Sequence, residues 1–338
     1  MKKLFILTLF TTVIFTQTTV NPDISVIGDL IINQDGEISS SGVEIAIQGY
    51  VNPFARADVF LHKHADHNAI HLEEAVISFE RGLPLNMGLR AGKFRPDIGK
   101  INKEHAHTLF FIEAPTSMKN ILGDEMWGTF GVEPNWLFPL PWYAKLSVGY
   151  FTKAMGTACN HEVEEAEEDS HEDHTEKTTA MSARLSHFVD LNDVTHLEIG
   201  SGYYRDIENH ELPHLHHVAE LDFKIKWRPD TYRSFTWQGE IFRKSPIENP
   251  ENESKIAGYT WMNYQFNKRW NVGVVADFST DIDGEEFKSY GAFAGFSPAE
   301  ESSVFRLVLS QEQHGDETHF GVKGQIIWAL GPHKPHQF

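Results

Sequence analysis

A repeated alternation of apolar and polar residues, in stretches of about ten, runs from residue 43 to residue 330. In one stretch, Ala219, Leu221, Phe223, Ile225 and Trp227 alternate with Glu220, Asp222, Lys224, Lys226 and Arg228. Strands of a soluble sandwich average about five or six residues, and their apolar face must meet a partner sheet. The longer runs here, with aromatic residues at the ends of their apolar faces, predict a transmembrane β-barrel with lipid outside and a wet lumen.

Period-two runs bounded by turn residues predict an all-β, antiparallel up-and-down barrel of about sixteen strands, with fourteen as the alternative. The predicted spans are 23–32, 43–52, 55–63, 70–80, 85–94, 124–133, 141–153, 178–189, 193–204, 216–228, 232–244, 254–266, 269–280, 287–296, 302–312 and 318–330. Short and long connections alternate between them. Outer-membrane barrels have short periplasmic turns and long extracellular loops, so an even strand count places both termini in the periplasm.

The first residues and the composition indicate where such a chain resides. Lys2 and Lys3 followed by the apolar run 4–15 predict a secretory signal peptide over 1–18, with the barrel over 22–338. The formal net charge of −19 argues against nucleic-acid binding and for attraction of cations. A lone Cys159 gives no internal disulfide. We therefore expect a protein in the outer membrane of a Gram-negative bacterium, in contact with outer-membrane lipid.

The same register predicts which polar side chains face the lumen. A barrel of about sixteen strands is too wide for side chains to fill, so these residues would line water. Both signs of charge occur among them, so their count predicts no ion selectivity. The predicted lumen residues are Arg90, Lys145, Arg184, Glu198, Glu220, Asp222, Lys224, Lys226, Glu240, Arg306 and Lys323, with Glu44, Gln48, Glu74, His196 and Gln238 beside them.

The third long loop, near 95–123, contains the apolar run Leu109-Phe-Phe-Ile112. An outer loop surrounded by water would rarely carry such a run. We expect this loop to fold into the lumen and narrow the pore. An external cap packed on neighbouring loops is the alternative.

The loop near 154–177 is dense in imidazole and carboxylate groups, with His171 and His174 as its tightest pair. Neutral imidazole suits zinc, copper or nickel, and carboxylates attract the cation. A tract of this composition indicates metal binding without defining a site. The alternative is a solvated acidic loop. The candidate ligands here are His161, Glu168, Asp169, His171, Asp173 and His174.

The other histidines group at connections already placed outside by their length. This grouping favours a shared role in collecting cations over chance scatter. Because no group has the spacing of a closed four-ligand zinc site, we expect weak, exchangeable Zn²⁺ binding. These further candidate ligands are His62, His64, His67, His105, His107, His210, His214, His216 and His217.

Several segments of the chain resemble a known family. Asn21-Pro22-Asp23-Ile24-Ser25, Leu89-Arg-Ala-Gly-Lys-Phe94 with Gly99-Lys-Ile-Asn102 and His105-x-His107, and the ending 331–338 are similar to porin-like outer-membrane barrels of Gram-negative bacteria. Members are often labelled zinc-regulated outer-membrane receptors. The resemblance implies a porin-type barrel whose expression or cargo relates to zinc, and the terminal Phe338 resembles the signal read by the barrel-assembly machinery. The chain lacks the length for a lumen-plugging domain, so uptake of the TonB type is not expected.

These observations predict a passive or weakly selective channel for small hydrophilic solutes or ions, with a mouth rich in His and acidic residues that binds divalent cations, zinc first. The alternatives are a metal-binding receptor without useful conductance and a structural barrel. No catalytic motif stands out, since Gly88-x-x-Ala91-Gly92 is strand glycine, so we do not expect an enzyme. The sequence leaves open whether the barrel forms a homotrimer.

Overall fold

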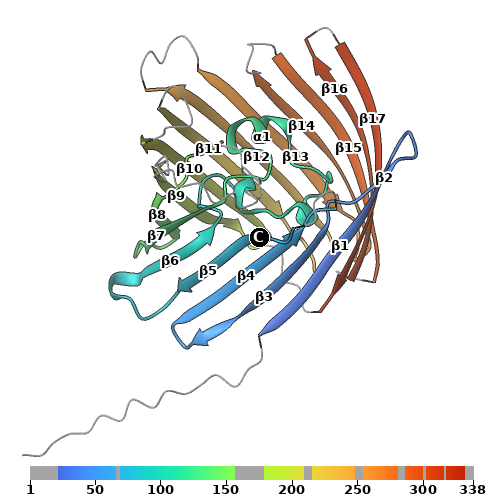
Figure 1. The fold of residues 1–338 in the computed structure, drawn as a ribbon. Coiled ribbons are helices and arrows are strands. Elements are labelled where there is room, and N and C mark those ends of the chain that lie inside the picture. Colours follow the sequence, from blue (N-terminus) through green and yellow to red (C-terminus); the bar gives the residue numbers. More distant parts are fainter. Residues whose placement is uncertain are drawn as a thin grey trace, which may run out of the picture.

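The computed structural model describes residues 22–65, 69–156, 179–208, 215–247, 254–280, 286–299, 302–315 and 317–331. These residues form one antiparallel sheet of 17 strands that closes on itself, because β1 pairs with β17 (Figure 1). The signal-peptide prediction, the loop 157–178 and the C-terminal residues 332–338 lie outside the described residues.

The strand bounds follow the predicted runs closely. They are β1 (Asp23–Asn33), β2 (Ile38–Ser39), β3 (Val43–Asn52), β4 (Ala55–Lys63), β5 (His71–Phe79), β6 (Met87–Phe94), β7 (Thr129–Leu137), β8 (Tyr143–Phe151), β9 (Thr179–Asn192), β10 (Thr195–Glu208), β11 (His216–Trp227), β12 (Ser234–Pro246), β13 (Lys255–Gln265), β14 (Trp270–Thr280), β15 (Glu286–Ala299), β16 (Ser303–His314) and β17 (Glu317–Leu330).

The first strand closes the barrel. β1 pairs with β17 from Val26↔Leu330 onward, and with β3 from Asp23↔Gln48 onward. The two-residue β2 only extends the hairpin beyond β1. Among the described residues, sixteen strands therefore make up the wall, which confirms the predicted all-β, sixteen-stranded antiparallel barrel.

The two faces of each strand differ as the alternation predicts. On β11, Leu221 is 59% exposed on the outer face, whereas Glu220 and Asp222 are buried at 2% and 4% on the inner face. Trp270 and Trp328, near the short turns, are exposed on the outside. A barrel in lipid needs an apolar outer face and a hydrogen-bonding partner for every strand, and this wall has both.

Several predicted boundaries differ from the observed ones by two to five residues, and side chains explain two of these differences. The predicted strand 124–133 is β7, which begins only at Thr129, because the Asn102 side chain pairs with the backbone of Trp127 and holds 124–128 in the preceding loop. The predicted turn 190–192 lies at 193–194, since the Asn192 Oδ1 accepts the Val194 backbone N–H at 3.0 Å. Such local side-chain bonds do not appear in an apolar/polar pattern.

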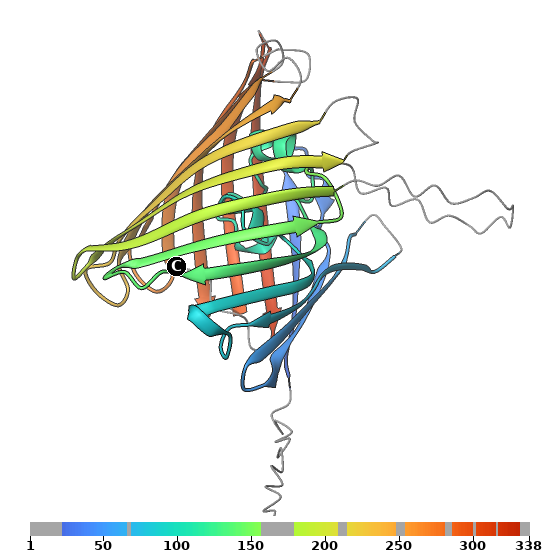
Figure 2. The same cartoon turned by 90° about the vertical axis from the view of Figure 1, so that its left-hand side faces the viewer.

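The connection from β6 to β7 lies inside the ring of strands (Figures 1 and 2). We call residues 95–128 the inner loop. It contains the short helices η2 (Ile101–Lys103), η3 (Ala106–Thr108) and α1 (Thr116–Leu122), while η1 (Pro84–Asn86) belongs to the β5–β6 turn. Its position is the inward one favoured by the run Leu109–Ile112, of which Leu109, Phe111 and Ile112 are buried. No helix among the described residues is long and apolar enough to cross a membrane.

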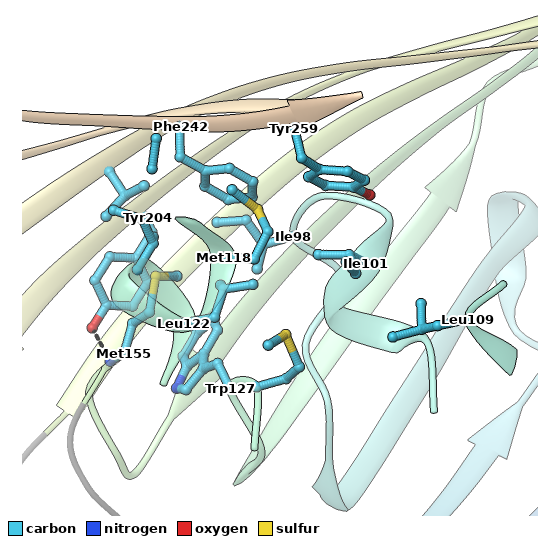
Figure 3. Packing of buried hydrophobic residues seen from close by; sticks show 14 of the residues in the cluster. Ile98, Ile101, Leu109, Met118, Leu122, Trp127, Met155, Tyr204, Phe242 and Tyr259 are labelled. Carbon is cyan, nitrogen blue, oxygen red and sulfur yellow. Dashed lines mark hydrogen bonds between the residues drawn. The ribbon is translucent and has the colours of Figure 1, made fainter. Parts of the chain in front are cut away.

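The inner loop carries its own hydrophobic core against the barrel wall (Figure 3). Met118, Leu122 and Trp127 pack with Tyr204 of β10 and Phe242 of β12 in one buried cluster. The Trp127 and Tyr204 rings meet edge-to-face with centroids 5.0 Å apart. This packing fills part of the lumen with protein and fixes this part of the loop against β10 and β12.

Candidate functional site

Three cavities surround the inner loop. The outer cavity, about 950 Å³, lies on the long-loop side and is lined by residues such as His62, Glu73 and Glu125. The paired cavity, about 910 Å³, lies on the short-turn side against β3 to β8 and includes Asp58, Arg90 and Glu133. The basic cavity, about 690 Å³, lies on the short-turn side against β11 to β17 and includes Lys226, Trp261 and Arg306.

The three cavities meet at the middle of the inner loop. Ile27, Glu104 and His107 line all three of them. We call the site of Glu104 and His107 the junction. The Glu104 carboxylate accepts a hydrogen bond from the Thr108 hydroxyl at 2.8 Å, which fixes one oxygen within its own loop.

Asp97 anchors the start of the inner loop to the wall. Its carboxylate lies 2.7 Å from the Lys103 and Lys145 ammonium groups, 3.5 Å from Arg184 and 3.0 Å from the Ser147 hydroxyl. The side chain is only 3% exposed. A buried carboxylate with several charged partners is strongly held, and removal of one member leaves the others uncompensated.

A second set of contacts ties the loop to β10, β11 and β12. The Glu240 carboxylate accepts the backbone N–H of Ile101 at 2.8 Å. Gly99 next to it has a φ of +60°, and a Cβ there would lie 2.5 Å from Glu240 Oε2, so this approach requires glycine. Lys100 forms an ion pair with Glu198 at 2.5 Å and approaches Asp222 at 3.3 Å.

His105 anchors the loop on the opposite side of the lumen. Its Nδ1 lies 2.9 Å from Glu44 and its Nε2 lies 3.1 Å from Glu74. Burial disfavours charge on the ring, but Glu44 and Glu73 raise the pKa of His105 well above its usual range. The imidazole, with a carboxylate at each ring nitrogen, therefore ties the loop to β3 and β5.

A β-bulge supplies the extra carboxylate at this anchor. In the pairing of β4 with β5, Phe60 faces Glu74 and Leu61 faces Leu72, so Glu73 is the additional residue. A bulge allows two consecutive side chains to reach the same face. Glu73 thereby pairs with Arg95 of the inner loop and also lies 3.6 Å from His105. Strict alternation predicts that Glu73 points to lipid, which is why its role was missed.

The far end of the loop is fastened to the last strands. The Arg306 guanidinium donates to the His107 carbonyl at 2.9 Å and to Gln325 Oε1 at 3.1 Å. Lys323 forms an ion pair with Glu113 at 2.6 Å. The loop is thus tied around much of the lumen and lies across it.

The predicted lumen residues fall into four groups, some of which share members. Arg90 pairs with Glu133 at 3.1 Å within the paired cavity, where Lys145 meets Asp97. Arg184 pairs with Glu220 at 2.8 Å and Asp222 at 2.6 Å. Those in contact with the inner loop are Arg90, Lys145, Arg184, Glu198, Asp222, Glu240, Arg306 and Lys323. Lys224 and Lys226 line the basic cavity.

The structure brings some predicted metal ligands together and separates others. His62 and His64 lie with ring centroids 4.2 Å apart, His71 is 5.8 Å from His64, and His64 Nε2 is 3.2 Å from Glu125. All four line the outer cavity. His105 and His107 lie deep in the lumen rather than at the rim, so their predicted position at the mouth is wrong.

The remaining predicted ligands do not join this group in the described part of the chain. His216 lies 3.6 Å from Asp206, and His217 stacks on Tyr203 of the outer face at 6.1 Å. The others lie outside the described residues, namely His67, His161, Glu168, Asp169, His171, Asp173, His174, His210 and His214.

One further group has the spacing of a metal site. Glu44, Glu73 and His105 each offer a ligand atom, and these atoms lie within 4.8 Å of one another. The same atoms already complete the ion pairs with one another and with Arg95. We therefore assign this group to the anchoring of the inner loop.

The site also contains residues that the sequence interpretation missed. Asp97, Glu104 and Glu133 are central to the anchors and the junction. Asp97 and Glu104 follow the strand β6 in a loop rich in charge, and this composition was the available signal. Their partners come from strands distant in sequence, and only the closed barrel brings them together.

Comparison with known proteins agrees with this fold. OprB of Pseudomonas putida has a TM-score of 0.61 over 92% of this chain and 94% of that one, at 9% identity. The trimer form of OmpT, an outer-membrane protein of Vibrio cholerae, has a TM-score of 0.58 over 92% and 100%, at 8% identity. The outer-membrane channel DcaP of Acinetobacter baumannii has a TM-score of 0.55 over 93% and 99%, at 10% identity.

Proteins similar in sequence give less information about this chain than the structural neighbours do. An uncharacterised protein of Aquifex aeolicus is 26% identical over 298 residues, which cover 78% of this chain. The chain spans 63% of the length of that curated relative. No family model matches the chain, and the resemblance to zinc-regulated receptors stays a prediction.

The fold therefore defines the class of protein. The chain is an all-β, sixteen-stranded closed barrel like those of outer-membrane porins and channels. Its apolar outer face and fully paired wall place it in the outer membrane of a Gram-negative bacterium. Nothing in these structural neighbours points to an enzyme.

Proposed function

We propose that this protein is a diffusion channel for small hydrophilic solutes or ions across the outer membrane. The observation that carries the proposal is the junction: a cavity on the long-loop side and two on the short-turn side share Glu104 and His107. The inner loop narrows the lumen there and is held by buried ion pairs at Asp97 and His105. The likeness to DcaP, an outer-membrane channel, agrees with this function.

The proposal also includes metal binding at the mouth of the barrel, which is the outer cavity. We propose that the outer cavity binds divalent cations, zinc first, in a weak and exchangeable manner. His62, His64 and His71 supply clustered imidazoles, and Glu125 supplies a carboxylate beside them. Another carboxylate of the lining, Asp124, raises the local concentration of cations.

Planar-bilayer recording tests the channel. Purified wild-type protein should give discrete conductance steps at repeated insertions. A complete lack of steps from heat-modifiable, folded protein would contradict the channel and favour a metal-binding receptor, in which the packed inner loop closes the lumen.

Titration calorimetry of the protein in detergent tests the proposed zinc binding. The triple variant His62→Gln/His64→Gln/His71→Gln should weaken zinc binding by at least about tenfold, which is about 1.4 kcal/mol. The matched control His187→Gln/His196→Gln removes histidines near the short turns, where His196 pairs with Asp190. Unchanged zinc affinity in the triple variant would remove the outer cavity as the metal site. Deletion of 157–177 tests the predicted His- and acid-rich loop in the same assay.

A further inference from the structure

The outer face of the barrel carries two arginines at the long-loop end, on the strands that flank β11 (Figure 1). Arg205 of β10 and Arg243 of β12 are exposed, and each lies three positions before the end of its strand. Their neighbours Asp206 and Phe242 are buried on the inner face, so both arginines point away from the lumen. A charge at this place calls for a partner, because the outer face meets lipid.

The described part of the chain supplies no countercharge for these two arginines. The Arg243 guanidinium donates to the Ser254 hydroxyl at 3.5 Å, and no described carboxylate forms an ion pair with either side chain. Lys288 of β15 is also exposed on the outer face at the long-loop end, but it forms an ion pair with Glu286 at 2.6 Å. Cations on a lipid-facing wall are tolerated near the interface, where anionic headgroups can neutralise them.

The strand register places the two arginines around one small residue. Tyr203 of β10, Ala219 of β11 and Arg243 of β12 are register partners in one row. Arg205 lies two positions beyond Tyr203 on the same face of β10. All four residues are exposed, and we call them the outer patch. Because Ala219 presents only a methyl group, the surface is lower there than at the long side chains around it.

The wall next to the outer patch is apolar. Leu221 and Ile241 are register partners on the outer face, and both are exposed. They lie two positions farther from the long loops than Ala219 and Arg243. Tyrosines such as Tyr203 are typical of the headgroup level in membrane proteins. The outer face therefore changes from apolar to cationic over a short distance, as a lipid layer changes from acyl chains to phosphates.

We infer that the outer patch binds a phosphate of an anionic glycolipid in the outer leaflet, the leaflet that meets the long loops in barrels of this kind. The phosphate would lie over Ala219 between Arg205 and Arg243, whose guanidinium groups match phosphate oxygens with paired N–H donors. The acyl chains would lie along Leu221 and Ile241. Since the chain has a formal net charge of −19, a local pair of cations is needed to hold an anionic lipid. This site faces away from the lumen and is independent of conductance.

Native mass spectrometry of the wild-type protein in detergent tests the binding. The probes are lipid A, which is an acylated glucosamine disaccharide with two phosphates, and the same lipid after removal of both phosphates. Lipid A should bind at least about tenfold more tightly. Inorganic phosphate in large excess should not displace it, because free phosphate makes no contact with Leu221 and Ile241. Equal affinity for the two lipids, or displacement by inorganic phosphate, would overturn the inference.

Two pairs of substitutions locate the site. Arg205→Gln/Arg243→Gln should weaken lipid A binding by about tenfold or more. The matched control Arg233→Gln/Lys288→Gln removes the same charge from exposed residues that already have ion-pair partners, and should bind lipid A as the wild type does. Equal losses in the two variants would reduce the effect to overall charge and overturn the outer patch as the site.

A third variant keeps both arginines. Ala219→Glu places a carboxylate where the phosphate would lie, and should weaken lipid A binding by about tenfold or more. Ala219→Ser is its matched control and should bind as the wild type does. All variants are compared as folded, heat-modifiable barrels, so a loss of binding does not reflect a loss of fold. Wild-type affinity in Ala219→Glu would place the lipid elsewhere and contradict the inference.

Discussion

The paired cavity and the basic cavity both lie on the short-turn side of one barrel, but the balance of positive and negative side chains that line them differs. In the paired cavity, Arg90 and Lys145 meet Glu133 and Asp97 directly. In the basic cavity, the cations greatly outnumber Glu104. The first set of charges holds the inner loop in place, whereas the second lines the other side of the lumen. Lumen charge therefore has a structural role wherever the inner loop supplies a partner, as Asp97 does for Lys145.

The largest effect should come from the central anchor of the paired cavity. Asp97→Ala leaves Lys103, Lys145 and Arg184 without their shared carboxylate, and should lower the free energy of unfolding by about 3–5 kcal/mol. The folded protein runs as a separate, heat-modifiable band on a gel. The temperature at which this band disappears should be lower for Asp97→Ala than for the wild type, and the difference measures the loss of stability. Asp97→Asn, which keeps the shape and the bond to Ser147, should give a smaller loss. A wild-type melting profile for Asp97→Ala would show that these ion pairs do not hold the loop.

A second substitution probes the same cavity at its wall. Arg90→Gln leaves Glu133, only 2% exposed, without its ion-pair partner, and should cost about 1–3 kcal/mol in stability. Thermal melting measures the loss. An Arg90→Gln variant as stable as the wild type would show that this ion pair does not stabilise the wall.

The comparison also shows what the sequence could predict. Alternation identifies the strands, the lumen face and the barrel because lipid on one side imposes a strict period of two. It fails where that period breaks, as at Glu73 in the bulge of β5, and where a side chain replaces a strand partner, as Asn102 does for Trp127. Whether a lumen cation is neutralised depends on the inner loop: Asp97 reaches Lys145, which is 48 positions away in the sequence. No local pattern contains that information.

The histidines show the same limit. Loop length places them on one side of the barrel, and His62, His64 and His71 do line the outer cavity there. His105 and His107 lie in a loop of the same side, but the loop folds inward and brings them to mid-lumen. Their depth depends on tertiary packing, mainly of Met118, Leu122 and Trp127 on the wall.

One measurement tests most directly whether solutes cross at the junction. Glu104→Cys in a Cys159→Ser background places a single thiol where the three cavities meet. A charged methanethiosulfonate reagent, added to either side of a planar bilayer, should reduce the conductance of each open channel. Lys288→Cys, which lines none of the cavities, should conduct as before after labelling. Full labelling of Glu104→Cys with unchanged conductance would contradict the account, because ions would then cross the barrel elsewhere.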